Sequence, residues 1–223
     1  MAASRRHIVV FGGTFDPIHN GHLRSAIELR ELLVADEVRL MPSHQPPLRG
    51  RPGASSAQRL AMVEAAVAEV PELQVDDREL RRDGASYTVD SLREMRQELG
   101  DEVALTAVVG SDAYAKLHRW QHWQQLLDYA NLMVIERADH PLQADAVVAD
   151  TMAACRVALA ADLGRRAAGG FYSSKLIQLP ISATDIRDRL AAGRSIHYLL
   201  PAAVAEQIAR WGLYQDTQTG TEN

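Results

Sequence analysis

Short apolar runs and longer segments of helical periodicity alternate along this chain. The apolar runs are rich in aliphatic and β-branched residues, which is typical of strands that are buried on both faces. A long proline-rich loop, from Ser43 to Ser56, interrupts the alternation. We predict strands at Ile8 to Phe11, Glu37 to Met41, Leu73 to Val75, Val103 to Val109, Leu132 to Ile135 and Leu176 to Leu179.

Helices are predicted between the strands, where apolar side chains recur at three- and four-residue intervals. The last of them has a proline in its first turn and a glycine just past its end, the usual asymmetry of helix ends. We also expect a helix within the Ala-rich residues 141–170, followed by flexible glycines at Gly169 and Gly170. The other predicted helices are Gly21 to Val34, Ala57 to Val70, Thr88 to Leu99, Thr184 to Ala192 and a final helix between Pro201 and Gly212.

The alternation of strands and helices indicates an α/β fold: a doubly wound, mostly parallel sheet with helices on both faces. The chain shows no internal repeat and no linker long enough to separate two full domains. We therefore expect one domain over residues 1–215, in which residues 181–215 form a small C-terminal helical subdomain, and a disordered tail at 216–223. In such sheets the ligand binds at the carboxyl ends of the strands.

Composition and charge restrict the partners. The 223 residues are 47% apolar and 24% charged, as in an ordinary soluble globular protein. The formal net charge of −5 gives no basic surplus that would hold a polyanionic backbone, so we expect no nucleic-acid partner. A small phosphorylated ligand remains compatible with this charge, because it needs only a few local donors.

The cysteine content and the apolar runs indicate the compartment. Cys155 is the only cysteine, so no intrachain disulfide can form, which fits a reducing environment. No apolar run approaches the roughly 20 residues of a membrane span, and the run near the start is too short for a signal peptide. We expect a cytoplasmic protein with no membrane partner; a homo-oligomer is left open.

The densest chemical signal is the stretch GGTFDPIHNGHL, residues 12–23, in which a loop from Gly12 to Asn20 connects a strand to a helix. The glycine pair allows tight turns, and His19 and His22 are spaced to point to the helix start together. Free N–H groups and the positive end of the helix dipole lie there, so the stretch predicts a phosphate site. A zinc site would need a third ligand that the sequence does not identify.

A second motif, ISATDIR at residues 181–187, also lies between a predicted strand and a helix. Ser182 or Thr184 can cap that helix, and this capping role is compatible with a functional one. Arg187 offers a fixed fork of donors for phosphate oxygens. Two motifs about 160 residues apart therefore fit one nucleotide site from two sides.

These two motifs resemble signatures of one nucleotidyltransferase superfamily with a Rossmann-like fold. The first is similar to its His-x-Gly-His signature, and the second to Ile-Ser-Ser/Thr-Thr-x-Ile-Arg, with Ala183 in place of the commoner serine. The resemblance implies that His19, His22 and Arg187 are catalytic, because they contact ATP phosphates. It also implies ATP contacts from Gly12, Gly13, Thr14, Phe15, Ile181, Ser182 and Thr184.

Further segments resemble the bacterial nicotinate-mononucleotide adenylyltransferases within that superfamily. The segments are Pro42 to Arg49, Ser86-Tyr87-Thr88, Gly110-Ser111-Asp112 and Trp120. The resemblance implies ATP contacts from Asp112 (to the sugar) and Arg137 (near adenine), although Asp112 and Thr88 would also serve as helix caps. Leu48 departs from the family, which usually has histidine there. The implied contacts with nicotinate mononucleotide are Ser43, Arg49, Tyr87, Thr88 and Trp120.

The reaction implied by the resemblance transfers AMP from ATP to nicotinate mononucleotide and gives deamido-NAD (nicotinate adenine dinucleotide) and pyrophosphate. The acceptor's own 5′-phosphate is the nucleophile, so no protein nucleophile is needed. Mg²⁺ is expected to arrive on the ATP phosphates, without a protein metal site. Nicotinamide mononucleotide and phosphopantetheine are alternative acceptors, and a non-catalytic nucleotide sensor is an alternative of another class.

Overall fold

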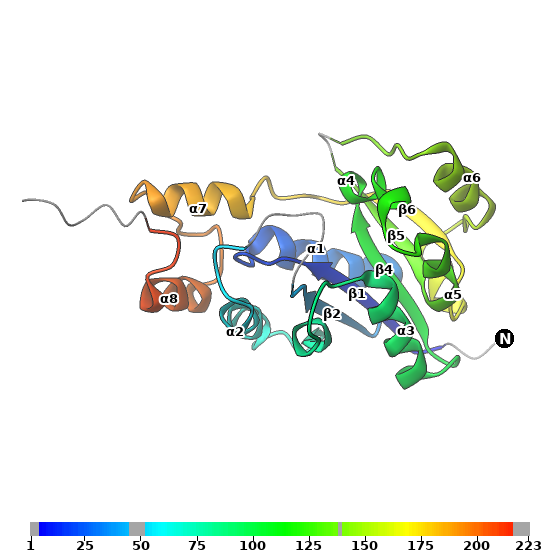
Figure 1. Cartoon of the computed structure of the whole chain (residues 1–223), viewed down its shortest axis with the longest axis horizontal. Helices are drawn as coiled ribbons and strands as arrows, with labels where there is room; N and C mark the ends of the chain where they lie inside the picture. The colour runs from blue at the N-terminus through cyan, green and yellow to red at the C-terminus, as the bar shows by residue number, and fades with distance from the viewer. Residues whose placement is uncertain (1–4, 45–51, 138–139, 216–223) are drawn as a thin grey trace, which may run out of the picture.

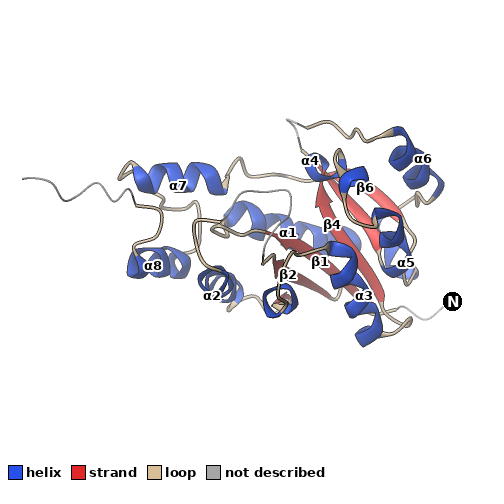
Figure 2. Cartoon of the chain, viewed as in Figure 1, coloured by secondary structure: helices blue, strands red, loops and turns tan. Residues whose placement is uncertain are grey.

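The computed structural model describes residues 5–44, 52–137 and 140–215. Its strands are β1 (His7–Gly13), β2 (Glu37–Pro42), β3 (Leu73–Val75), β4 (Ala104–Gly110), β5 (Asn131–Glu136) and β6 (Phe171–Lys175). They form one sheet in the order β3-β2-β1-β4-β5-β6, and all neighbouring strands are parallel (Figure 1, Figure 2). The predicted α/β fold is confirmed, and the sheet is parallel throughout the described residues.

Helices connect the strands and cover the sheet. The α-helices are α1 (Asn20–Leu33), α2 (Ser56–Val67), α3 (Thr88–Leu99), α4 (Ser111–Tyr114), α5 (Leu126–Tyr129), α6 (Ala146–Ala154), α7 (Ala183–Ala191) and α8 (Ala202–Trp211). Short 3-10 helices are η1 (Arg78–Arg81), η2 (Leu117–Arg119), η3 (Trp123–Gln125) and η4 (Ala160–Arg165). Of the described helices, none is long and apolar enough to cross a membrane.

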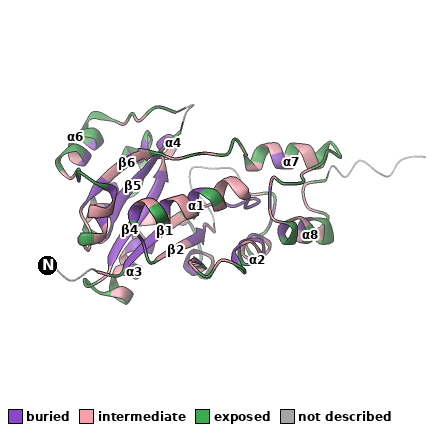
Figure 3. Ribbon diagram, turned by 180° about the vertical axis from the view of Figure 1, so that it is seen from behind, coloured by how far each residue is buried: buried purple, intermediate pink, exposed green. Residues whose placement is uncertain are grey.

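Both faces of the sheet are buried, because alternate residues of each strand point to opposite sides. In β1, Val9 packs in a cluster with α1, α2 and η4, whereas Ile8 and Val10 pack in a second cluster with α3, α5 and α6. Figure 3 shows the buried strands enclosed by helices whose outer sides are exposed. This two-sided burial is why the central strands appear in the sequence as continuous apolar runs.

The helix ends follow from local capping chemistry. Ser55 caps α2 in a capping box with Gln58, and α8 lies between Pro201 and Gly212, as predicted. The predicted first and third helices agree with α1 and α3 to within one residue. The second ends at Val67 rather than at residue 70, since the chain turns there to enter β3.

The prediction of a last strand at Leu176 to Leu179 is wrong. The strand is β6, in which Phe171 is 2% exposed and pairs with Leu132. Ile177 is instead 75% exposed, and its N–H donates to the Glu28 carboxylate on α1. Because β6 is an edge strand whose residues alternate between buried and accessible, its sequence is half polar and gives no apolar run.

Residues 141–170 contain the expected helix, α6, and a further short helix, η4. Gly169 has a φ of 82°, and the N–H of Gly170 donates to Asn131 Oδ1 at 2.8 Å. The two glycines therefore lead directly into β6. Farther along the chain, α7 and α8 lie next to each other at one end of the molecule, beyond the sheet (Figure 1). The predicted tail at 216–223 lies outside the described residues.

Candidate nucleotide-binding site

The first motif leads from the end of β1 into the start of α1. Gly12 and Gly13 belong to β1 and pair with β2, so the predicted loop begins two residues later, at Thr14. Phe15 is 2% exposed and turns the chain with a φ of 49°. A Cβ at Gly13 would lie 2.9 Å from the Phe15 ring, so this turn requires glycine there.

The two histidines of the motif stack on each other at the N-terminus of α1. Their ring centroids are 3.7 Å apart with an interplanar angle of 21°. His19 is the N-cap residue, and its Nδ1 accepts a hydrogen bond from the backbone N–H of His22 at 3.3 Å. A Cβ at Gly21 would lie 3.0 Å from the His19 ring, so glycine allows the ring to approach the helix start. The pair thus adds two imidazoles to the positive end of the helix dipole.

The His19 imidazole is neutral near pH 7. Burial, and then the positive charge of Arg137, lower its pKa from 6.5 to about 4. Because Nδ1 accepts the hydrogen bond from His22, the ring proton resides on Nε2. His19 therefore offers one N–H donor to a phosphate oxygen and carries no standing positive charge.

The second motif packs against the first. Arg187 Nη1 donates to the backbone oxygen of Asp16 at 2.7 Å, and its Nη2 donates to Thr184 Oγ1 at 3.3 Å. The carbonyl oxygen of Ile181 would lie 3.4 Å from a Cβ at Gly21. Ser182 caps α7 by accepting from the backbone N–H of Asp185 at 3.1 Å. The structure thus brings together the two segments that the sequence predicts to share one triphosphate.

The carboxyl ends of β4 and β5 contribute a third group. Asp112 and Arg137 form an ion pair, with 3.9 Å between Arg137 Nη1 and Asp112 Oδ1. The positive charge of Arg137 contributes, after burial, to the lowered pKa of His19. Gly110, rather than Asp112, is the N-cap of α4. The alternative that Asp112 serves as the N-cap of this helix is therefore wrong.

These groups surround the point where the winding of the sheet reverses. The chain leaves β1 toward β2 and β3 and returns through β4 toward β5 and β6. His19 and His22 follow β1, Asp112 follows β4 and Arg137 follows β5. Nucleotides bind in doubly wound sheets at this crevice, outside the carboxyl ends of the strands.

A second group of predicted contacts lies beside the end of β2. Ser43 donates its N–H to the carbonyl oxygen of Gly13 at 2.9 Å. The N–H of the next residue, His44, donates to Ser86 Oγ at 2.9 Å, so the loop before α3 is bound to the loop after β2. Tyr87 is the N-cap residue of α3, with no side-chain capping bond. Thr88 is therefore the first helical residue, and the alternative that it caps the helix is wrong.

Trp120 and Arg49 are the two remaining predicted contacts with nicotinate mononucleotide, and only Trp120 lies within the described residues. Trp120 is half-buried at the end of η2 and packs against the second apolar cluster. Arg49 and Leu48 lie outside the described residues. Of the predicted substrate contacts in the proline-rich loop, only Ser43 therefore lies within the described residues.

Comparisons with known proteins agree with this geometry. Residues 10–189 match the family described as Cytidylyltransferase-like. A protein of Marinobacter nauticus named "Probable nicotinate-nucleotide adenylyltransferase" is 48% identical over 206 residues, which is 92% of this chain and 95% of the relative. A protein of the same name from Pseudomonas aeruginosa is 44% identical over 212 residues, covering 94% and 98%.

The chain belongs to the cytidylyltransferase-like family. Within it, the chain groups with the relatives named nicotinate-nucleotide adenylyltransferase. The nicotinic acid mononucleotide adenylyltransferase of Plasmodium falciparum, solved with NaAD, has the same fold, with a TM-score of 0.70 at 17% identity over 94% of this chain and 97% of that one. At that identity the likeness concerns the fold alone.

Asp16 is a residue of the candidate site that the sequence analysis missed. Its carboxylate, 6% exposed, accepts hydrogen bonds from the N–H groups of Gly53 (2.8 Å) and Ala54 (3.0 Å) and from the hydroxyl of Tyr214 (2.7 Å). Arg187 Nη1 lies 3.9 Å from the same carboxylate. In the sequence, Asp16 precedes a proline and indicates only a turn.

Arg59, on α2, is a second missed residue. It is 1% exposed and donates to the carbonyl oxygens of Thr14 (2.7 Å) and His44 (3.2 Å) and to Ser56 Oγ (3.1 Å). Burial lowers its pKa, but an arginine keeps its proton at neutral pH. Arg59 thus fixes the backbone beside both predicted substrate groups. Its position in a helical pattern gives no sign that it is buried.

Glu79, in η1, supports the loop that precedes α3. It is 6% exposed, and Ser91 Oγ donates to its Oε1 at 2.8 Å. Burial raises the pKa of this carboxyl, while hydrogen bonds from Ser91 and Ser86 act against the rise. Ser86 also accepts a hydrogen bond from the N–H of His44. Glu79 therefore binds the residue through which the two loops are joined.

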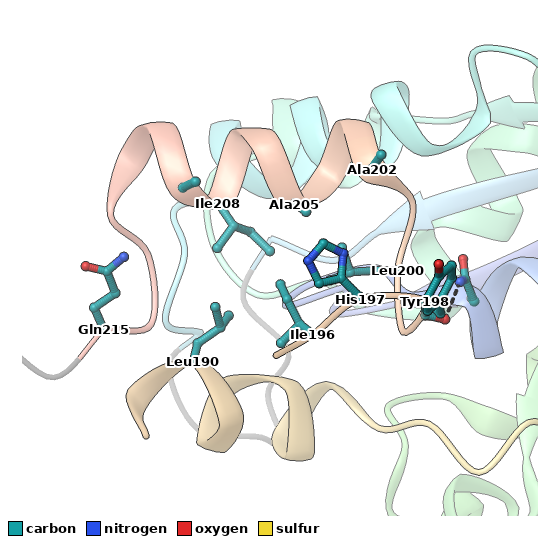
Figure 4. Close-up of a pocket in the computed structure, with 11 residues that line it drawn as sticks. Leu190, Ile196, His197, Tyr198, Leu200, Ala202, Ala205, Ile208 and Gln215 are labelled. Carbon is teal, nitrogen blue, oxygen red and sulfur yellow. Dashed lines mark hydrogen bonds between the residues drawn. The ribbon is translucent and has the colours of Figure 1, made fainter. Parts of the chain in front are cut away.

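A hollow of about 440 Å³ between α7 and α8 is separate from this site (Figure 4). Leu190, Ile196, Leu200 and Ile208 give it an apolar lining, and of the first motif only Asn20 reaches it. None of the predicted substrate contacts lines it. The candidate site therefore rests on the convergence of the two motifs and not on this hollow.

Proposed function

We propose that this chain is a nicotinate-nucleotide adenylyltransferase, which transfers AMP from ATP to nicotinate mononucleotide. The observation that carries the proposal is the contact between the two motifs: Arg187 binds the Asp16 carbonyl three residues before His19, at the reversal of the sheet. The names of relatives at 42–48% identity, such as those of Marinobacter nauticus and Pseudomonas aeruginosa, support the same reaction.

In the proposed reaction, a 5′-phosphate oxygen of nicotinate mononucleotide attacks the α-phosphorus of ATP. The bond between that phosphorus and the bridging oxygen to the β-phosphate breaks, and pyrophosphate leaves with the electron pair. Such a transfer needs alignment and stabilisation of the developing charge more than a protein nucleophile. In our proposal, the neutral Nε2–H of His19, together with His22 and Arg187, supplies donors to the phosphate oxygens. Ser182 and Thr184 at the start of α7 contact the outer phosphates.

The remaining ATP contacts follow from the positions of the strands. In the proposal the backbone of Gly12 to Phe15 lines the triphosphate. Asp112, half-exposed at the end of β4, accepts from a ribose hydroxyl, and Arg137 lies near adenine. Ile181 contributes its backbone beside Gly21.

The acceptor binds, in this proposal, beside the start of α3. The free N–H groups at a helix N-terminus favour an anion, so the amides near Tyr87 and Thr88 suit the nicotinate carboxylate. Trp120 supplies a flat indole for the pyridine ring. Ser43, held on the carbonyl of Gly13, lies between the two substrates. Arg49 remains a prediction.

Mg²⁺ is proposed to enter on the ATP phosphates. The donors that the two motifs bring together are imidazole, guanidinium and backbone N–H groups, which suit phosphate oxygens. The Asp16 carboxylate beside them is already bound by Gly53, Ala54 and Tyr214, and Asp112 is paired with Arg137. Within the described ranges, no group of three or more His, Cys, Asp or Glu residues is placed to hold a metal ion. When bound, the ion would neutralise charge on the phosphates.

Three further parts of the assignment stand as proposals. We propose that residues 1–215 act as one nucleotidyltransferase domain, with residues 181–215 as its helical part. We propose that the protein works in the cytoplasm, in keeping with its single cysteine. Assembly into a homo-oligomer remains a prediction.

The decisive experiment measures pyrophosphate release from ATP with each of three acceptors: nicotinate mononucleotide, nicotinamide mononucleotide and phosphopantetheine. The proposal predicts the highest kcat/KM with nicotinate mononucleotide. A higher kcat/KM with either of the other acceptors would assign the chain to the reaction with that acceptor instead. ATP binding without turnover of any acceptor would instead indicate a nucleotide sensor.

A further inference from the structure

Tyr214, three residues after the end of α8, is bound to the first motif. Its hydroxyl donates to Asp16 Oδ1 at 2.7 Å, across 198 positions of sequence. The chain reaches this position through a left-handed Gly212, with a φ of 59°, and Tyr214 itself has a φ of 62°. A non-glycine residue in the left-handed region is uncommon, so tertiary contacts hold Tyr214 in place.

The ring of Tyr214 is held as well as its hydroxyl. A Cβ at Gly53 would lie 3.1 Å from the Tyr214 ring, so the ring packs directly on the backbone before α2. Burial and the neighbouring Asp16 carboxylate raise the pKa of the Tyr214 hydroxyl. The hydroxyl therefore keeps its proton at neutral pH and acts as a donor.

Asp16 connects Tyr214 with the ATP-binding groups. Its carboxylate is fixed by Tyr214 and by the N–H groups of Gly53 and Ala54. The same residue binds Arg187 twice, through its carbonyl oxygen at 2.7 Å and, more loosely, through its carboxylate at 3.9 Å. A shift of Asp16 would therefore move Arg187 and the loop that leads to His19.

We propose that Tyr214 is a positioning residue of the ATP site, which acts through Asp16 on Arg187 and on the loop before His19. This inference rests on the proposed function, because it assigns Arg187 and His19 to the triphosphate. Tyr214 does not need to touch a substrate. It determines where the donors lie, and it thereby makes the C-terminal end of the described chain part of the ATP site.

The test compares Tyr214→Phe with the wild-type protein. The variant keeps the ring and removes only the hydroxyl. Loss of a hydrogen bond to a charged group is expected to lower kcat/KM for ATP about tenfold or more. The KM for nicotinate mononucleotide should change less than about twofold, since the Tyr214 hydroxyl donates to Asp16 of the first motif and not to Ser43, Tyr87 or Thr88. Tyr198→Phe is the matched control, because Tyr198 is 92% exposed; it should leave both constants unchanged.

A second variant keeps the proposal testable if Tyr214→Phe fails to fold. Gly53→Ala pushes a methyl group against the Tyr214 ring and leaves the hydroxyl present, so it should also weaken ATP use selectively. Unchanged ATP constants in both variants would overturn the proposal. An equal rise in the KM of both substrates, with a lower melting temperature, would also overturn it, because that is the pattern of a purely structural residue.

The same variants separate this inference from the proposed function. If the wild-type protein releases no pyrophosphate with any acceptor, the proposed function fails, and the ATP dissociation constant measured by calorimetry then decides the role of Tyr214. A dissociation constant about tenfold higher in Tyr214→Phe would support the positioning role. An unchanged constant would refute it.

Discussion

At the scale of residues, the site depends on the protonation and direction of two imidazoles. His19 is neutral because burial and Arg137 lower its pKa to about 4, and its Nδ1 is occupied by the N–H of His22. The His22 ring is held by the edges of aromatic neighbours, with Phe15 at a centroid distance of 5.1 Å. Both rings therefore have fixed orientations before a nucleotide binds, which reduces the reorganisation needed in the transition state.

His22→Ala tests the catalytic part of this description. Removing one donor that acts on transition-state charge typically costs about 10²–10³-fold in rate. We expect kcat to fall by that order, and the ATP dissociation constant to change much less. Steady-state kinetics and calorimetry give the two numbers. His197→Ala, at an exposed histidine beside α8, is the control and should retain wild-type kcat; a near-normal kcat in His22→Ala would refute the role.

The buried histidines also predict how stability depends on pH. The pKa values of His7 and His19 are both lowered from 6.5 in the folded state, mainly by burial. The unfolded chain therefore binds more protons, and the free energy of unfolding falls as the pH drops below about 6.5. For His19 the loss continues to about pH 4 and amounts to on the order of 3 kcal/mol.

His19→Asn isolates this contribution, because asparagine retains the ability to cap a helix. Urea unfolding at a series of pH values between 7 and 4 should give a shallower pH dependence for the variant, with the remainder due to His7 and other groups. Identical slopes for the two proteins would contradict the low pKa of His19.

At the scale of elements, one buried arginine connects α2 to the loops on either side of the site. Arg59 donates to the carbonyl oxygens of Thr14, after β1, and His44, after β2. Such contacts position the loops at the carboxyl edge of the sheet, where helix and strand alone leave them unfixed. The Arg59 side chain therefore contributes both to the stability of α2 and to the geometry of the site.

Arg59→Met should therefore destabilise the fold as well as disturb the site. It keeps most of the side-chain volume but removes the arginine donor of two part-buried carbonyl oxygens, which is expected to cost about 2–4 kcal/mol. Urea unfolding measures this loss. Arg81→Met removes an arginine whose side chain is 68% exposed, and it should cost less than about 0.5 kcal/mol. Equal effects of the two substitutions would refute the account of Arg59.

The edge strand shows where the hydrophobic pattern misleads. A central strand such as β4 is buried along nearly its whole length and is recognised as an apolar run. In β6 only alternate residues are buried, so its sequence is not a continuous apolar run. The segment from Leu176 to Leu179 that follows is more apolar and resembles a buried strand more closely, although Ile177 is exposed. The error concerns the bounds of the last strand and not the second motif, which begins at Ile181.

At the scale of the whole molecule, the sequence predicts those parts of the site that are continuous in the chain. The glycine-histidine stretch, the ISATDIR motif and the strand-to-helix junctions are local patterns, and the doubly wound sheet brings them to one edge. The sequence does not predict the roles of Asp16, Arg59 and Tyr214. Their roles come from contacts between distant segments, such as the 198 positions between Asp16 and Tyr214, and no local pattern marks them.

The most direct measurement is a crystal structure of the protein with a non-hydrolysable ATP analogue and Mg²⁺. The account predicts that His19, His22 and Arg187 each contact triphosphate oxygens at hydrogen-bonding distance, about 2.7–3.2 Å. It would be contradicted by a triphosphate bound away from the start of α1, or by an Arg187 that points away from the nucleotide in the complex.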